Sequence, residues 1–180
     1  MLTIQRTPIA TGDPVTPEEL ADHLRIEAIE VAGAMRYARA AADEIEQYAN
    51  LALLDQTITA VADPLTAKVH SLPIGPVQAG ATITVDLQEH DGSYTPVTDG
   101  WYLVAGLHAA VHFDNIPGGH LRITYTAGYG ADAAAIPDDL SLAILDQALR
   151  LYDRRGDVDN TPGLAPSTAR ICARYRRVAV

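Results

Sequence analysis

Two histidines four residues apart, His108 and His112, come closest to a metal-binding pattern in this sequence. On a helix, this spacing would place both imidazoles on one face, where they could bind a zinc ion. The two residues instead flank Ala109, Ala110 and Val111, a run that is typical of a strand, and no third ligand follows at a recognisable spacing. We therefore predict no metal site.

Two acidic groups have simpler explanations than catalysis. Asp153, Asp157 and Asp159 resemble the start of a calcium-binding loop, but the glycine and the final glutamate that such a loop requires are missing. Asp138 and Asp139 fall in the first turn of a predicted helix, where carboxylates interact favourably with the helix dipole. Neither group is predicted to be a catalytic or a calcium site.

Nucleophilic and phosphate-binding motifs are also missing from the sequence. Cys172 is the single cysteine, so no intrachain disulfide can form, and nothing around it resembles a catalytic thiol motif. No serine has the surroundings of a hydrolase nucleophile. Lys68 is the single lysine and belongs to no phosphate loop, and Gly128-Tyr129-Gly130 lacks the third glycine of a dinucleotide-binding turn. We expect no catalytic residue, no cofactor and no enzyme activity.

The bulk properties indicate a folded protein built from one domain, or from one domain with a sizeable insertion. Its 180 residues are 48% hydrophobic and 20% charged, which is ordinary for a globular chain and argues against disorder. No apolar run approaches the roughly 18 residues of a membrane span. Because the start of the chain lacks the pattern of a secretory signal, we expect synthesis in the cytoplasm and no membrane partner.

The helical parts of the chain lie at its two ends. Residues 1–15 show no clear period and are interpreted as an N-terminal arm. Thr16-Pro17-Glu18-Glu19 is a capping-box start, which predicts a helix over 16–29. Apolar residues at steps of three and four predict a second helix over 30–53, and a similar pattern predicts a third over 137–155.

Alternating apolar and polar residues predict a β insertion over about 55–128. Six short segments have this pattern, separated by glycine- and proline-rich turns. The predicted fold class is therefore α+β, a bundle of about four helices with an inserted antiparallel β-sheet or small barrel. The predicted strands are Thr57–Val61, Val69–Leu72, Ile83–Leu87, Trp101–Val104, Ala110–Phe113 and Leu121–Ala127.

The net charge of −10 is unevenly spread. Residues 1–149 hold six basic and 20 acidic side chains, whereas the segment from Arg150 onward holds seven arginines and three aspartates. An acidic body repels nucleic-acid phosphate, so tight DNA binding by the whole surface is not expected. Residues 156–166 are predicted to be a linker, and residues 167–180 a detached amphipathic helix that docks onto a partner.

Four features of the sequence stand out by their order and spacing: Thr16–Ile26, Ile45–Tyr48 followed by Leu54–Thr57, Leu72–Val77, and Ile123–Gly130 before Ile136-Pro137. Together they resemble the head–tail connector (adaptor, or head-completion) proteins of tailed phages and gene transfer agents. The resemblance covers about residues 15–155, and it departs from the family at Glu27-Ala28-Ile29-Glu30, where such proteins often carry an Asp-rich segment.

The resemblance implies a structural role in the neck of a virion or phage-like particle. Such proteins form a ring, commonly twelve-fold, beneath the portal of a filled capsid and provide the platform for the tail. The implied partners are the portal protein, neighbouring copies of the chain, and a tail, stopper or terminator protein. DNA would pass through the ring without specific binding. Whether the particle is a phage or a gene transfer agent stays open.

Three sets of residues are assigned to this role as hypotheses. Tyr125, Tyr129 and Pro137 are expected to pack the seam between the β insertion and the helices. Portal docking is assigned to the last helix and ring contacts to the second helix. The portal-docking residues are Arg170, Ile171, Arg174, Tyr175, Arg177 and Val178, and the ring-interface residues are Met35, Arg36, Arg39 and Asp43.

The alternative function is a small ligand- or carbohydrate-binding β module. Trp101, Tyr102, Tyr125 and Tyr129 could line an aromatic patch for such a ligand. Strand alternation, however, puts Trp101 and Tyr102 on opposite faces of their strand, which argues against a single stacking platform.

Overall fold

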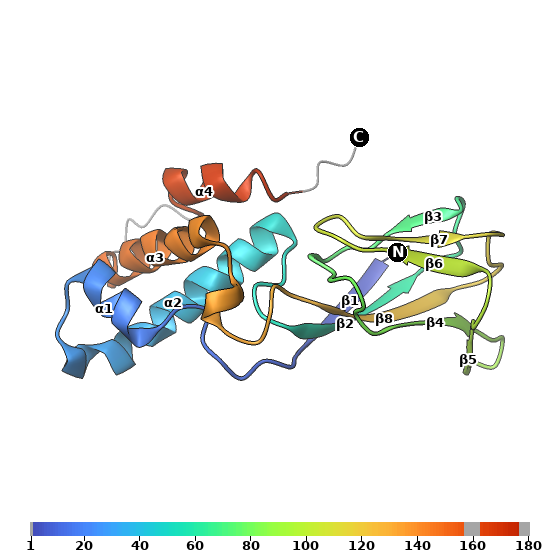
Figure 1. Cartoon of the computed structure of the whole chain (residues 1–180), viewed down its shortest axis with the longest axis horizontal. Helices are drawn as coiled ribbons and strands as arrows, with labels where there is room; N and C mark the ends of the chain where they lie inside the picture. The colour runs from blue at the N-terminus through green and yellow to red at the C-terminus, as the bar shows by residue number, and fades with distance from the viewer. Residues whose placement is uncertain (1, 157–162, 177–180) are drawn as a thin grey trace. The chain divides into compact units, whose positions relative to one another are not determined.

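The computed structural model of the protein describes residues 2–156 and 163–176 (Figure 1). The chain divides into two compact units. The β unit comprises Met1–Ala10 and Asp55–Tyr129, and the helical unit comprises Thr11–Leu54 and Gly130–Val180. The fold is α+β, as the sequence predicts, and its strands form two antiparallel sheets rather than a closed barrel.

The β unit is built from a five-stranded and a three-stranded sheet, in which every neighbouring pair of strands is antiparallel. Figure 1 shows β3, β7 and β6 as a layer distinct from the longer sheet. The order in the five-stranded sheet is β1 (Leu2–Pro8), β2 (Gln56–Ala62), β8 (Leu121–Ala127), β4 (Ile83–Gln88) and β5 (Tyr94–Pro96). The order in the three-stranded sheet is β3 (Val69–Ser71), β7 (Ala110–Phe113) and β6 (Trp101–Val104).

The two central strands, β2 and β8, carry the core of the β unit. Their side chains alternate strictly between buried and partly exposed positions, because successive residues of a strand point to opposite faces. Ile58 pairs with Tyr125 and Ala60 with Ile123, and all four side chains are buried. The period of two seen in the sequence therefore corresponds to one apolar face and one threonine-rich face.

The N-terminal segment differs from the arm without regular structure that the sequence suggests. Leu2–Pro8 forms β1, and all seven residues pair in register with β2. The strand lies at the edge of the sheet, and most of its side chains are exposed, including Leu2 and Ile4 at 46% and 40%. An edge strand without a buried face leaves no strong alternation in a sequence, and so this strand was missed.

The helical unit contains four α-helices whose ends follow from local chemistry. The Thr16 side chain accepts a hydrogen bond from the Glu19 backbone, and Glu19 bonds back to the Thr16 backbone, which closes a capping box. Arg25 and Asn50 adopt left-handed backbone angles and end the first two helices. The helices are α1 (Pro17–Leu24), α2 (Ala28–Ala49), α3 (Asp138–Asp153) and α4 (Pro166–Cys172), with a 3-10 turn, η1, at Ala133–Ala135.

The second and third α-helices pack against each other in the core of the helical unit. The Gln147 amide Nε2 of α3 donates to Glu44 Oε2 of α2 at 2.6 Å, and the rings of Tyr37 and Tyr152 meet edge to face. Around these contacts the apolar stripe of α2 is buried, including Ala38 and Ile45. Small side chains in the stripe allow close approach of the helices.

The last helix is not detached, which corrects the sequence-based expectation. The Thr168 hydroxyl is buried and donates to the Ala143 carbonyl of α3, and Ile171 and Cys172 are buried beside it. The Ala165 backbone N–H, at the start of α4, donates to Gln147 Oε1 at 2.8 Å. The glycine and proline breakers suggested separation, but the apolar face of α4 has a core to join within its own unit.

Candidate interaction surfaces

The candidate metal ligands do not form a site. Across residues 2–156 and 163–176, no group of three or more His, Cys, Asp or Glu side chains is placed to hold a metal ion. His112 instead stacks on Tyr102, and its Nδ1 lies 3.3 Å from the tyrosine hydroxyl. Asp157 and Asp159 of the incomplete calcium pattern lie outside the described residues.

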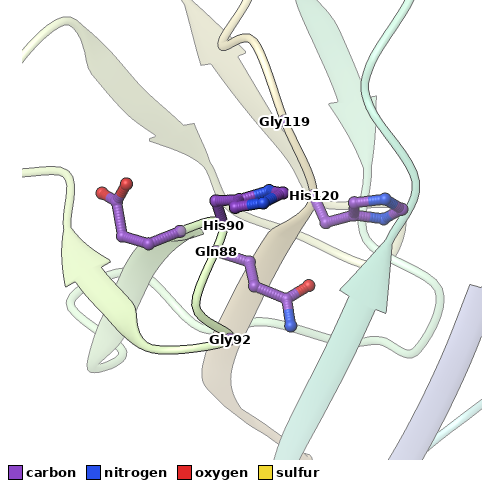
Figure 2. Close-up of a pocket in the computed structure, with 6 residues that line it drawn as sticks. Gln88, His90, Gly92, Gly119 and His120 are labelled. Carbon is purple, nitrogen blue, oxygen red and sulfur yellow. The ribbon is translucent and has the colours of Figure 1, made fainter.

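An open depression of about 380 Å³ lies at one end of the β unit (Figure 2). Its lining side chains come from the turn between β4 and β5 and from the residues just before β8. His120 Nδ1 lies 3.5 Å from Asp63 Oδ1, and both side chains are about half exposed. None of the lining residues is buried, whereas ligand pockets enclose most of their ligand. The lining residues are Gln88, Glu89, His90, Gly92, Gly119 and His120.

The aromatic side chains do not form one stacking platform. Trp101 Nε1 donates to the Val97 carbonyl, while Tyr102 lies on the opposite face of β6 and stacks on His112. Tyr125 is buried, donates its hydroxyl to the Ile74 carbonyl, and accepts a hydrogen bond from the Ile74 N–H. Burial raises the pKa of the Tyr125 phenol well above its usual range. These contacts leave no shared aromatic surface for the alternative, ligand-binding function.

The stretch at the end of β8 is fixed by backbone geometry. Gly128 has φ = 146°, and a Cβ atom there would lie 2.6 Å from Asp55, so that only glycine fits without a shift. Its N–H donates to the Pro76 carbonyl, and Gln78 Nε2 donates to the Tyr129 carbonyl at 2.6 Å. Tyr125 is thus engaged within the β unit, and the assignment of Tyr125, Tyr129 and Pro137 to a seam stays a prediction.

The predicted ring-interface residues divide between the core and the surface of α2. Arg36, Arg39 and Asp43 are exposed. Met35 is buried and packs inside the helical unit instead. Arg39 forms a bidentate ion pair with Asp13, with Nε 2.6 Å from Oδ1. The exposed arginines leave α2 with a charged outer face, and its role in a ring stays a prediction.

A second feature of α2 was missed by the sequence analysis. Tyr37 and Tyr152 form an edge-to-face pair with centroids 5.6 Å apart at 87°. The guanidinium of Arg36 lies 4.9 Å from the centroid of Tyr37, and that of Arg155 lies 3.9 Å from the centroid of Tyr152. The four residues are called the arginine–tyrosine cluster below. No sequence signal could have linked the pair on α2 to the pair at the end of α3, because the two pairs are more than a hundred residues apart.

The predicted portal-docking residues are also divided by the structure. Ile171 is buried, whereas Arg170 is exposed. Asp139 accepts hydrogen bonds from Arg174 at 2.8 Å and from the Tyr175 hydroxyl at 2.6 Å, which ties the end of the chain to α3. Arg177 and Val178 lie outside the described residues. Burial also raises the pKa of the Cys172 thiol to about 11, so this cysteine is unreactive near neutral pH.

Among the described helices, none combines the length and the apolar character that crossing a membrane requires.

No protein-family model and no curated protein sequence matches the chain.

Solved structures provide the matches. The chain is 27% identical to a chain in the virion of a native gene transfer agent (GTA) particle, with a TM-score of 0.81. It is 30% identical to a chain in the neck of an empty GTA particle computed with C6 symmetry, with a TM-score of 0.77. It is 27% identical to a chain in the neck of a native GTA particle computed with C12 symmetry, with a TM-score of 0.75. Each match covers 99% of this chain and 97% of the other. Similarity of this extent shows that the protein belongs to the connector-type neck proteins of gene transfer agent particles.

Proposed function

We propose that this protein is the head–tail connector, or adaptor, subunit that forms a ring beneath the portal of a phage-like particle. The observation that carries the proposal is the match of nearly the whole chain, both units included, to components of a GTA neck. The C6 and C12 symmetries of those necks support a ring of copies. The role is structural, at the neck of the particle, and we assign the chain no reaction.

The charge distribution supports passage of DNA through such a ring. Residues 1–149 carry 20 acidic and six basic side chains. DNA moving through a ring of this composition would meet few cations to bind, because like charges disfavour phosphate contacts. We therefore propose that DNA passes without specific binding, and that the ring provides the platform for a tail, stopper or terminator protein.

Portal binding is proposed for the outer face of α4 and the residues that follow it. Arg170 and Arg174 are exposed there, and the arginine-rich end suits an acidic groove on a partner. Because Ile171 holds α4 on α3, removing the whole segment would also disturb the helical unit. The better test is Arg170→Glu, which leaves both the buried face of α4 and the ion pair between Arg174 and Asp139 intact. Loss of portal capture in a pull-down is expected, and undiminished capture would remove the docking assignment.

The proposed function as a whole is tested on particles. In cells that produce the particle, deletion of the gene for this chain is expected to leave filled capsids without tails, visible by electron microscopy. Complementation with the full chain should restore tailed particles that contain it. Tailed particles of normal number without this chain would contradict a connector role.

A further inference from the structure

The arginine–tyrosine cluster is a cationic surface that has no acidic partner among residues 2–156 and 163–176. Arg36 and Arg155 are exposed, and each guanidinium rests against a tyrosine ring. Arg36 NH2 donates to the Tyr37 hydroxyl at 3.1 Å, and Arg155 NH1 donates to the Tyr152 carbonyl at 2.9 Å. Within the described residues, neither arginine pairs with a carboxylate.

Such an arrangement suits recognition of carboxylates on another protein. A guanidinium stacked on an aromatic ring keeps free N–H groups at its edge, where it can hold a carboxylate with two hydrogen bonds. The rings also restrict the arginine side chains before binding, which lowers the entropy lost on association. Tyrosine and arginine are the residue types enriched in the centres of protein interfaces.

The first helix carries the complementary charge. Glu18 and Asp22 are exposed, lie four residues apart and therefore share one face of α1. Neither has an ion-pair partner among the described residues. The carboxylate of Glu19, between them, instead accepts a hydrogen bond from the Thr16 backbone N–H in the capping box. The helix Pro17–Leu24 contains no lysine or arginine. Two free carboxylates on one face thus match two guanidiniums held on tyrosine rings.

We infer that the arginine–tyrosine cluster of one copy binds α1 of the neighbouring copy, with Glu18 and Asp22 paired to Arg36 and Arg155. The two surfaces come from different segments, α1 for the carboxylates and α2 with the end of α3 for the arginines, and a head-to-tail contact in a cyclic ring joins two different surfaces. This inference rests on the proposed ring and identifies residues that would join neighbouring copies in it. A contact made mainly by charges is weak for isolated copies and grows when the portal gathers them together.

The contact can be detected in solution even when it is weak. A nitroxide is attached to Glu27→Cys, next to α1, in full-length chain; the buried Cys172 thiol does not compete for the label. The labelled chain is mixed with isotope-labelled wild-type chain at about 1 mM protein, where a contact with a Kd near that value is substantially populated. Amide signals of Tyr37 and Tyr152 are expected to broaden in about 0.02 M salt and to recover in about 0.5 M salt.

Charge reversal supplies the specificity test. Arg36→Glu with Arg155→Glu is expected to weaken the association at least about tenfold, and Glu18→Arg with Asp22→Arg should weaken it similarly. Mixing the two charge-reversed chains should restore it. Lys68→Glu is the control, because it reverses an exposed cation of the β unit that the proposed contact does not use. Unchanged amide spectra outside the mutated sites would show that each variant folds.

Two outcomes overturn the inference. One is broadening centred on other residues, and the other is no broadening anywhere at low salt. Recovery of the chain in purified particles distinguishes failure of the inferred contact from failure of the proposed function. If the wild-type chain is recovered in tailed particles and the Arg36→Glu, Arg155→Glu chain is recovered equally, the connector role stands and the proposed contact falls. If the wild-type chain is absent from particles, the proposed function falls.

Discussion

Arginine is stacked on tyrosine in both units, but the two sites differ in where the carboxylate comes from. In the β unit, Arg122 lies 3.8 Å from the centroid of Tyr94 and donates from Nε and NH2 to Asp86 at 3.0 and 2.8 Å. In the helical unit, Arg36 and Arg155 lie against tyrosines and have no acid among the described residues. At the first site the carboxylate belongs to the same chain, and the ion pair joins β4 to β8. At the second site we infer that a neighbouring copy supplies the acid.

The difference shows how one chemical arrangement can serve stability or assembly. Asp86 and Arg122 face each other across β4 and β8, and the Asp86 side chain is only 11% exposed, so that solvent screens the pair poorly. Arg36 and Arg155 lie on the outer surface, where water solvates them without cost while no partner is bound. Mutations should therefore affect folding at the first site and association at the second.

The largest effect is expected for Asp86→Ala, which leaves Arg122 without its acceptor in a partly buried place. We expect a loss of about 2–3 kcal/mol in the free energy of unfolding, typical of charged hydrogen bonds lost from a protected site. Trp101, the single tryptophan, reports unfolding of the β unit by its fluorescence in denaturant.

The matched control is Asp63→Ala, which removes an acid paired with His120 at an exposed position. It should change the unfolding free energy by no more than about 0.5 kcal/mol. If both variants lost the same unfolding free energy, burial of an ion pair would not determine how much it stabilises this unit.

A smaller effect on the stability of the β unit is expected from protonation of His70 in β3. Its Nε2 is buried and has no hydrogen-bond acceptor or donor among the described residues. Burial lowers the pKa of the His70 imidazole from its usual 6.5. Below about pH 6.5 the unfolded chain therefore binds a proton that the folded chain does not, so the β unit loses stability as the pH falls.

The measurement is the unfolding midpoint of wild-type and His70→Met chains from about pH 7.5 to about pH 5. The wild-type midpoint should fall more steeply, since methionine occupies a similar volume and does not titrate. A parallel pH dependence in the two chains would remove His70 as the source. His112→Gln, in which a partly exposed histidine is replaced, serves as the control variant.

The smallest effect on folding is expected at the arginine–tyrosine cluster. Arg36→Gln with Arg155→Gln removes two exposed charges that form no ion pair within the described part of the chain, so the unfolding free energy should change by no more than about 0.5 kcal/mol per site. Far-UV circular dichroism in denaturant follows the helical unit. A loss of several kcal/mol would mean that the cluster stabilises the helices of one chain, and the contrast with Arg122 would no longer hold.

Local patterns in the sequence were sufficient to predict most helices of the helical unit and the central strands of the β unit. The capping box at Thr16 and Glu19 depends on neighbouring residues, and so it was predicted directly. The alternation in β2 and β8 was readable because one face of each strand is fully buried. The α+β class follows from these elements.

Features that depend on contacts between distant segments could not be read in this way. The pairing of β1 with β2 joins residues that are 48 to 60 positions apart, from Pro8 with Gln56 to Leu2 with Ala62, and the exposed side chains of β1 give no periodic signal. Met35 and Ile171 were predicted at interfaces, yet the structure buries both within the helical unit. A stripe of apolar residues shows that a helix packs against something, but not whether that surface belongs to the same chain.

The sequence by itself determined the first three helices and the central strands, the acidic body with its basic end, and the family resemblance. Those properties depend on residue type and on spacing within one segment. The tertiary structure alone decided that α4 packs on α3 through Thr168 and Ile171. It also decided that Tyr37 meets Tyr152 while Arg36 and Arg155 lack an acid and Arg122 has one. The physical reason is that burial and charge pairing are set by which surfaces meet, and this information is shared between segments rather than contained in any one of them.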